Sequence, residues 1–339
     1  MKRLLPFAPL LLLGALLLSP AAALTGTKRG LDIWWGQVLP ALLPSFITVR
    51  LAQNWGLLRL FRSHPRMQLM AVIGFSLLSG APNGAKLLGS LTKEGTIPVQ
   101  TADRLLPLVN NVSPVFLLSI IASGLLKNKA LFPPMAIAFY GCILCLMIPF
   151  ALDQKAAVSR FSQEAAKDMT FPQALSAAIE SSMLDMLRIG GCILFICTLL
   201  SLIQPIVPDE TAYAILAGCM EVSIGATVMA GLPLPLRWRV SLLIGASAFG
   251  GLSLFLQTLC CYPDLKPVSY LLKKLVLGGM VGLVCYLLFP LFPAVSTVFA
   301  DRQQVLQRSL TLGALLFSSL LSAAFMALLS LMVAPQKKN

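Results

Sequence analysis

Residues 67–91 read MQLMAVIGFSLLSGAPNGAKLLGSL, an apolar run long enough to cross a bilayer but interrupted near its middle by Gly80-Ala81-Pro82-Asn83-Gly84. Glycine weakens a helix interior, and proline also removes a backbone N–H donor. A helix that is broken inside lipid leaves N–H and C=O groups bare, and each costs several kcal/mol unless protein or a water-filled cavity satisfies it. The stretch therefore predicts a broken or re-entrant membrane element beside other protein or a polar cavity.

The composition extends this expectation to the whole chain. Of 339 residues, 57% are hydrophobic and 12% are charged, about half the charge density of a soluble domain, and the mean hydropathy is +0.84. Apolar runs of spanning length recur with no soluble block between them, so we predict an all-α polytopic membrane protein.

The net charge of +13 does not indicate nucleic-acid binding here. Basic residues such as Lys28, Arg29, Lys273 and Lys274 are assigned to short loops between apolar runs, where they set topology. The eight cysteines lie in or beside apolar runs and are expected to be packing residues. With His64 as the only histidine and no nucleophile–base set, we expect no metal site, no cofactor and no enzyme.

We expect five apolar elements in each half of the chain, separated by a charged linker at Asp153–Thr170. They are Leu4–Leu24, Trp34–Phe61, Met67–Leu91, Leu105–Leu126 and Leu131–Leu152, then Ala174–Ile206, Thr211–Leu232, Arg239–Cys261, Tyr270–Phe292 and Leu310–Val333. Leu4–Leu24 is expected to be a simple span, although a signal peptide ending near Ala23 is the alternative. The predicted units are 1–30, 31–152, 153–170, 171–293 and 294–339.

The two halves resemble each other in the order of their elements. Gly84-Ala85 aligns with Gly225-Ala226 at an offset of 141, and Asn110–Ser113 aligns with Gly250–Ser253 at an offset of 140. We therefore predict two inverted repeats with broken or re-entrant hairpins, as in secondary transporters. The alternative is that glycine and proline only permit close packing or kinks. The residues expected to break helices are Gly80, Pro82, Gly84, Pro114, Gly225, Gly250 and Gly251.

Ionisable and polar groups inside apolar runs are candidates for a substrate site. Lys86 is expected to face an anionic solute or to pair with Glu221, and Glu221 to contact the solute or carry a coupling proton. The alternative is an ion pair that only joins the hairpins. Polar side chains near the breaks complete the predicted site, unless they merely satisfy broken backbone: Asn110, Asn111, Ser113, Ser223, Ser253 and Gln257.

Charged residues in the two long helices receive a different prediction. Asp185 and Arg188 are spaced for pairing on one face, and with Glu180 they indicate an interfacial helix with a neutralised polar stripe. Arg50 and Asn54 predict a similar stripe in the first half.

Five sequence motifs around these residues resemble motifs of the sporulation integral membrane proteins of the YlbJ type, which carry a nucleoside-recognition Gate domain. The resemblance covers roughly Leu31 to Pro293, departing where Ala81 replaces an expected aromatic residue and Ser223 an expected threonine. The motifs are LPALLPSFI at 39–47, SGAPNGAK at 79–86, NNVSPVF at 110–116, EVSIG at 221–225, and FGGLS at 249–253 with Gln257.

The resemblance implies an inverted-repeat fold like that of concentrative nucleoside carriers and a role in spore maturation. It also implies a small anionic cargo, dipicolinate, carried across the cell membrane or the membrane around the forespore. A dicarboxylate suits half-helix N-termini and Lys86 better than a neutral nucleoside does. A nucleoside carrier and a non-transporting scaffold of a sporulation complex are the alternatives. A coupling proton or sodium ion is expected, and the oligomeric state is left open.

Overall fold

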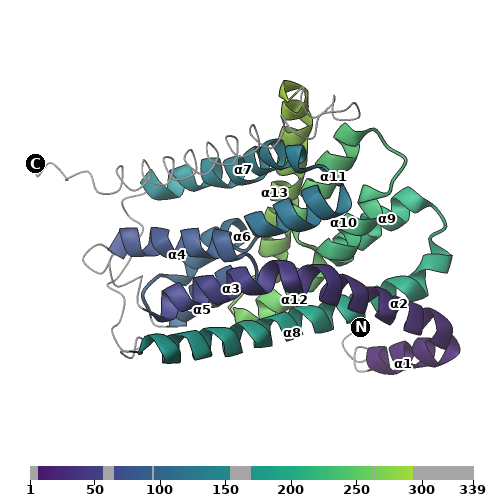
Figure 1. Cartoon of the computed structure of the whole chain (residues 1–339), viewed down its shortest axis with the longest axis horizontal. Helices are drawn as coiled ribbons and strands as arrows, with labels where there is room; N and C mark the ends of the chain where they lie inside the picture. Colours follow the sequence, from purple (N-terminus) through teal and green to yellow (C-terminus); the bar gives the residue numbers. More distant parts are fainter. Residues whose placement is uncertain (1–6, 56–64, 94, 153–168, 263, 293–339) are drawn as a thin grey trace, which may run out of the picture.

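The computed structural model describes residues 7–55, 65–93, 95–152, 169–262 and 264–292. Within these ranges every regular element is a helix, which confirms the all-α prediction (Figure 1). Three parts of the predicted elements lie outside the described residues: residues 153–168 of the expected linker Asp153–Thr170, the C-terminal span Leu310–Val333 with its tail, and the end of Trp34–Phe61.

The helices follow the chain in this order. The first half contains α1 (Ala8–Leu18), α2 (Pro20–Ile33), the π-helix η2 (Trp34–Val38), α3 (Leu39–Asn54), α4 (Pro65–Ser79), α5 (Asn83–Lys93), α6 (Val99–Val109), the π-helix η4 (Phe116–Leu125), the short η5 (Lys129–Leu131) and α7 (Phe132–Leu152). The second half contains α8 (Phe171–Ile203), η7 (Gln204–Ile206), α9 (Glu210–Met220), α10 (Val222–Ala230), α11 (Leu236–Phe249), α12 (Gly251–Cys261), α13 (Pro267–Leu288) and η8 (Phe289–Leu291).

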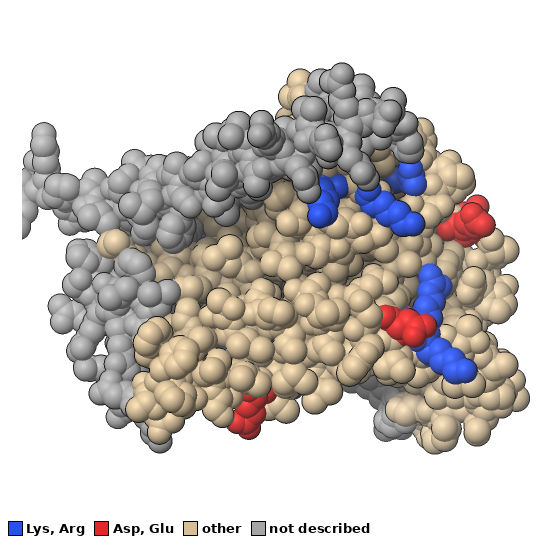
Figure 2. All heavy atoms as spheres, in the orientation of Figure 1, with Lys and Arg blue, Asp and Glu red and all other residues tan. Residues whose placement is uncertain are grey.

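Four helical segments of the described chain are long and apolar enough to cross a membrane: Lys129–Ile148, Phe171–Ile206, Leu236–Cys261 and Pro267–Leu291. A fifth is added if α1 and the helix after it form one bent span. In the view of Figure 2 the described surface is mostly uncharged, as lipid contact requires. The protein is therefore a multi-pass membrane protein.

The simple span predicted at Leu4–Leu24 is wrong, because the helix is interrupted at Ser19. Residues 9–18 and 20–54 meet there at an angle of 102°. Ser19 precedes Pro20, and proline disfavours a helical conformation in the residue before it, so Ser19 adopts φ −134° and ψ 59°. The second segment then continues without a break through η2 and α3 to Asn54.

The long helix formed by α2, η2 and α3 packs antiparallel along α8 (Figure 1). Near one end Thr27 Oγ1 lies 2.7 Å from Thr198 Oγ1, and near the other Asn54 Nδ2 donates to the Ala174 carbonyl at 3.3 Å. A Cβ on Gly30 would lie only 2.9 Å from Leu194 Cα, so small residues allow this close contact.

Four helix breaks occur at corresponding places in the two halves, as predicted. The ends of α4 at Ser79 and α9 at Met220 are 141 positions apart, and the ends of α6 at Val109 and α11 at Phe249 are 140 apart. The half-helices α5, α6, α9 and α12 have 11 residues each, about 16 Å at 1.5 Å per residue. That is roughly half of a bilayer core of about 30 Å, so none of them spans it alone.

Two of the predicted helix-breaking glycines lie inside helices instead. Gly84 belongs to α5, where a Cβ would lie 2.6 Å from the Val109 carbonyl oxygen. Gly225 belongs to α10, where a Cβ would lie 2.3 Å from Gly218 Cα in α9. For these two positions the alternative reading is right, since the missing side chain permits close packing across the break. The α9–α10 contact also shows that these half-helices fold back on each other as a hairpin.

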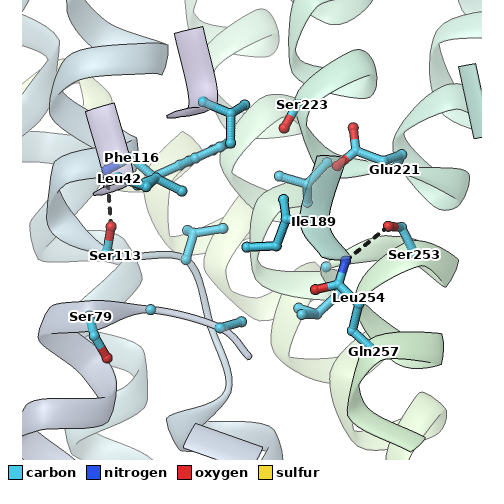
Figure 3. Close-up of a pocket in the computed structure, with 16 residues that line it drawn as sticks. Leu42, Ser79, Ser113, Phe116, Ile189, Glu221, Ser223, Ser253, Leu254 and Gln257 are labelled. Atoms are coloured by element: carbon cyan, nitrogen blue, oxygen red, sulfur yellow. Dashed lines mark hydrogen bonds between the residues drawn. The ribbon is translucent and has the colours of Figure 1, made fainter. Parts of the chain in front are cut away.

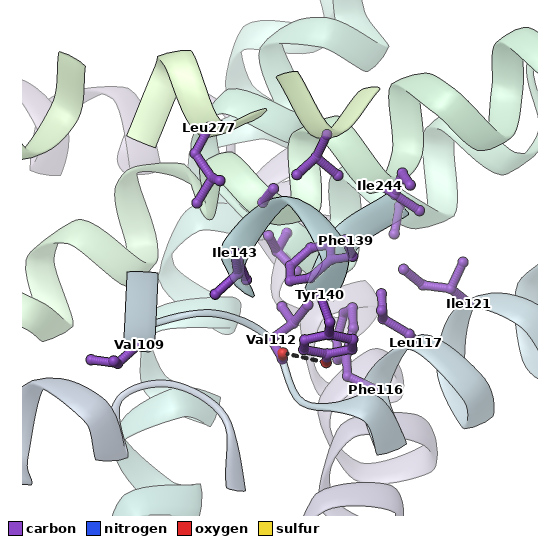
Figure 4. Close-up of a cluster of buried hydrophobic side chains, with 14 of the residues drawn as sticks. Val109, Val112, Phe116, Leu117, Ile121, Phe139, Tyr140, Ile143, Ile244 and Leu277 are labelled. Carbon is purple, nitrogen blue, oxygen red and sulfur yellow. Dashed lines mark hydrogen bonds between the residues drawn. The ribbon is translucent and has the colours of Figure 1, made fainter. Parts of the chain in front are cut away.

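A buried apolar cluster anchors the second break against α7, α11 and α13 (Figure 4). Its side chains include Phe116, Leu117, Phe139, Ile244 and Leu277. Inside this cluster the Tyr140 hydroxyl donates to the Val112 carbonyl at 3.0 Å. The contact satisfies a carbonyl that the broken helix leaves without an internal partner.

Candidate functional site

All four helix breaks line one central cavity of about 70 Å³ (Figure 3). The α4–α5 and α6–η4 breaks contribute from one side, and the α9–α10 and α11–α12 breaks from the other. The lining consists of Ser79, Gly80, Ala81, Val112, Ser113, Phe116, Glu221, Val222, Ser223, Gly250, Ser253, Leu254 and Gln257, with Val38, Leu42 and Ile189. Five of the predicted substrate-binding residues therefore meet at one place: Ser113, Glu221, Ser223, Ser253 and Gln257.

We call the contact between the α4–α5 and α6–η4 breaks the first-half crossing. Backbone groups that the two breaks free form a hydrogen bond with each other there. The Ala81 N–H donates to the Asn111 carbonyl at 2.7 Å, so each break supplies a partner for the other. Gly80 has φ +82°, and a Cβ there would lie 2.9 Å from the Ser113 nitrogen. Only glycine combines that conformation with so close an approach.

We call the contact between the α9–α10 and α11–α12 breaks the second-half crossing. A glycine with positive φ permits a close backbone approach there too. Gly251 has φ +72°, and a Cβ would lie 3.1 Å from the Met220 carbonyl oxygen. The difference lies in Glu221, which is 6% exposed and faces the cavity. Its Oε2 accepts from the Ile224 N–H at 2.8 Å, so the carboxylate caps the positive N-terminal end of α10.

Asn110 and Asn111 are fully buried but do not line the cavity, and the prediction that they bind substrate is not met by this geometry. Asn111 Nδ2 donates to the carbonyls of Pro107 and Leu108 at 3.0 and 2.8 Å, closing the end of α6. Asn110 Nδ2 donates to Thr258 Oγ1 at 2.7 Å and to the Tyr270 hydroxyl at 3.1 Å. Asn111 therefore satisfies broken backbone, which was the alternative, whereas Asn110 joins the break to side chains of α12 and α13.

Lys86 pairs with Asp185 in α8 and not with Glu221. Asp185 is fully buried, and its other oxygen lies 2.7 Å from Arg50 Nη2 in α3. Arg188 Nη1 lies 3.6 Å from Asp185 Oδ1, and Arg50 also donates to Asn83 Oδ1 at 2.7 Å. We call Arg50, Lys86, Asp185 and Arg188 the basic cluster.

The predicted polar stripes on two interfacial helices are therefore wrong. Asp185 faces inward because α3 and α5 both bring cations to it, and a buried carboxylate is tolerated only when it is paired. Glu180, in contrast, is exposed. With three cations and one carboxylate, the basic cluster carries an excess charge of +2.

The basic cluster adjoins the central cavity. Ile189, which lines the cavity, lies four residues after Asp185 on the same face of α8. Asn83, which accepts from Arg50, lies two residues after the cavity-lining Ala81. An anion that approaches the cavity from this side meets a positive field.

One cation was missed because we assigned it to a loop. Lys274 lies inside α13 with a 1% exposed side chain, and its Nζ donates to Asn111 Oδ1 at 2.7 Å and to the Asn110 carbonyl at 3.2 Å. The available signal was its position among apolar residues after Pro267, while its neighbour Lys273 is exposed. Among the described residues no group of three or more His, Cys, Asp or Glu side chains is placed to hold a metal ion.

No family model and no solved structure matches the chain. The chain is 25% identical over 356 aligned positions to the sporulation integral membrane protein YlbJ of Bacillus subtilis (strain 168). The alignment covers 90% of this chain and 85% of that protein. The resemblance to the YlbJ-type sporulation integral membrane proteins is thus confirmed along nearly the whole chain.

Proposed function

We propose that this protein is a secondary membrane transporter of a small anionic solute of the dipicolinate kind, working by alternating access. The observation that carries the proposal is that all four helix breaks line a single cavity. Broken backbone at membrane depth is tolerated where it is buried in protein or lines a cavity, and paired broken segments in two halves are typical of transporter binding sites.

Two observations support an inverted relation between the halves, which this mechanism requires. The breaks recur at offsets of 141 and 140 positions, and each half has its own crossing of two breaks. The long helices that precede the two sets of breaks run antiparallel, as equivalent helices do around a two-fold axis in the membrane plane. Such an arrangement resembles that of concentrative nucleoside carriers, and rocking one half against the other would open the cavity to alternate sides.

The size of the cavity favours a closed conformation. A volume of about 70 Å³ accommodates a few water molecules, whereas sites for small organic ligands measure roughly 300–1,000 Å³. A dicarboxylate therefore enters only after the elements around the cavity separate. Alternating access provides such a separation.

The charges around the cavity favour an anion that travels with a cation. The basic cluster is partly accessible, with Lys86 25% and Arg50 19% exposed, and its excess positive charge attracts carboxylates. Glu221 inside the cavity repels the same solute unless a cation neutralises it. We assign Glu221 to the coupling cation, a proton or a sodium ion. The name of the Bacillus relative, a sporulation integral membrane protein, supports a role in sporulation. We propose the cell membrane or the membrane around the forespore as the place of transport.

Flux into liposomes that contain the purified full-length protein tests the proposal. Labelled dipicolinate should accumulate under an inward gradient of protons or of sodium, and the gradient that drives uptake identifies the coupling ion. Labelled nucleosides should not accumulate. Lys86→Met should lower dipicolinate uptake about tenfold, because it removes one of three cations, while Lys93→Met at an exposed position of the same helix should not.

Three results distinguish the alternatives. If the liposomes take up nucleosides but not dipicolinate, the protein is a nucleoside carrier and the proposal of an anion transporter is wrong. A folded protein that moves neither solute under either gradient would favour the membrane scaffold. Equal loss in Lys86→Met and Lys93→Met would remove the basic cluster from the transport mechanism.

A further inference from the structure

Lys274 is a buried cation that the proposed transport mechanism does not use. It lies in the described part of α13, where its ammonium reaches two oxygens at the first-half crossing, the Asn110 carbonyl and Asn111 Oδ1. Among the described residues it forms no salt bridge with a carboxylate. Its charge is therefore balanced only by neutral oxygen atoms.

The position of the ammonium explains why this arrangement is stable. Asn110 directly follows the end of α6, where helix carbonyls lack internal partners and the helix dipole is negative. A lysine in an apolar helix normally extends its charge toward the membrane surface, yet Lys274 is turned inward and is 1% exposed. The broken end of α6 thus acts as a cation-binding site.

In transporters with broken helices, unwound carbonyls and the C-terminal ends of half-helices coordinate a coupling sodium ion. We propose that the Lys274 ammonium is a built-in cation: at the first-half crossing it takes the place that a coupling sodium ion takes in such transporters. The crossing consequently takes no exchangeable ion. The effect of Lys274 on ion coupling rests on the proposed function, whereas the binding of its ammonium at the crossing does not.

Removing the ammonium would leave buried oxygens suited to an alkali ion. The Asn110 carbonyl and Asn111 Oδ1 would lose their donor, and Asn110 Oδ1 is already buried without a hydrogen-bond partner. Each unsatisfied buried acceptor is destabilising. A small monovalent cation in the vacated space would supply the missing positive charge, whereas the larger choline ion would not fit.

Thermal unfolding of the purified full-length protein in detergent, in sodium chloride or in choline chloride of equal ionic strength, tests this inference. In choline, Lys274→Ala should lower the midpoint by about 5 °C or more, and sodium should restore at least half of that loss. Lys274→Met should lose stability without recovering in sodium, because its side chain fills the space. Lys273→Ala, at an exposed position, is the control and should match the wild type.

Two outcomes would overturn the inference: equal midpoints of Lys274→Ala in sodium and choline, or Lys274→Met as stable as the wild type. If Lys274→Ala yields no folded protein, Lys274→Arg and Lys274→Gln decide instead. Arginine keeps the charge and should be clearly more stable than glutamine, and equal stability of the two contradicts a built-in cation.

The liposome assay separates this inference from the proposed function. If wild-type protein transports dipicolinate, uptake by Lys274→Ala should depend more steeply on sodium concentration than wild-type uptake does, whichever ion drives the wild type. Absence of that steeper dependence would contradict the inference. If the wild type transports nothing, the proposed function fails, and the unfolding series still decides what Lys274 does.

Discussion

The two crossings of broken helices lie at corresponding places but differ in backbone conformation and in the polar groups that they present to the cavity. Asn110 ends α6 with φ −94°, whereas Gly250 ends α11 with φ +89°. At the first-half crossing the Asn111 amide donates to carbonyls at the end of α6, and the Lys274 ammonium donates to Asn111 Oδ1 and to the Asn110 carbonyl. The Asn110 amide donates to Thr258 and Tyr270, away from the cavity. At the second-half crossing the Glu221 carboxylate caps α10 and also faces the cavity. The comparison teaches that the two halves contribute unequally to the cavity: the second half presents the Glu221 carboxyl group, whereas the first half presents neutral hydroxyl groups such as that of Ser113.

Two buried carboxylates in the described part of the chain extend this comparison. Asp185 is enclosed by cations from three helices, whereas Glu221 accepts backbone N–H groups beside the cavity. We therefore expect Asp185 to determine stability and Glu221 to determine transport.

The largest effect on stability is expected for Asp185→Asn. The substitution leaves the Arg50 and Lys86 charges without their carboxylate and should lower the free energy of unfolding by on the order of 3 kcal/mol. Unfolding of the detergent-purified protein measures this loss. Asp209→Asn is the control, because Asp209 caps the exposed first turn of α9 and asparagine caps equally well. A loss no larger than the control would mean that the basic cluster does not join α3, α5 and α8.

For Glu221→Gln we expect a small change in the free energy of unfolding but a large loss of transport. Glutamine retains an oxygen that can accept from the Ile224 N–H, so stability should change by less than about 1 kcal/mol. Gradient-driven dipicolinate uptake should fall about a hundredfold, equivalent to about 2.7 kcal/mol, because the coupling cation loses its charged partner. Glu210→Gln at an exposed position of α9 should retain full uptake. Unchanged coupling in Glu221→Gln would place the coupling ion elsewhere.

The smallest effects compare the two crossings directly. Gly80→Ala and Gly251→Ala each place a side chain on a residue with positive φ, and each should lose about 1–3 kcal/mol of stability. Gly141→Ala in α7 meets no atom within 4 Å and should lose nothing. Gly80 belongs to the first break of its half and Gly251 to the second break of its half, so losses at both positions support a close backbone approach at each crossing. A loss at only one of them would mean that the other crossing tolerates a side chain.

Local sequence signals predicted where the helices break. Gly80 and Pro82, Asn110 to Pro114, and Gly250 with Gly251 are residues whose backbone preferences alone interrupt a helix. Ser19 carried an equally local signal before Pro20, but the length of the apolar run concealed it. These three breaks were thus predictable because they depend on nearest neighbours along the chain. The α9–α10 break was not, because it falls at Glu221 and the predicted breaker Gly225 lies inside α10.

The partners of the charged residues were not predictable in the same way. Asp185 and Arg188 are spaced to pair within one helix, but the decisive partners of Asp185 come from α3 and α5. Lys274 resembles a loop lysine beside Lys273 until α13 is placed against the end of α6. Such pairings follow from tertiary packing, on which a single sequence carries no direct signal.

Protection of introduced cysteines by solute tests the central claim most directly. In a variant whose eight cysteines have been replaced and which retains transport, Ser113→Cys and Ser223→Cys place one thiol in each half beside the cavity. Dipicolinate should slow the reaction of both thiols with a small thiol reagent by about tenfold, equivalent to about 1.4 kcal/mol of binding free energy at the concentration used. It should not slow the reaction of Ser90→Cys, which lies on the exposed face of α5. Protection at only one of the two cavity positions, or at neither, would contradict a single solute site formed by both halves.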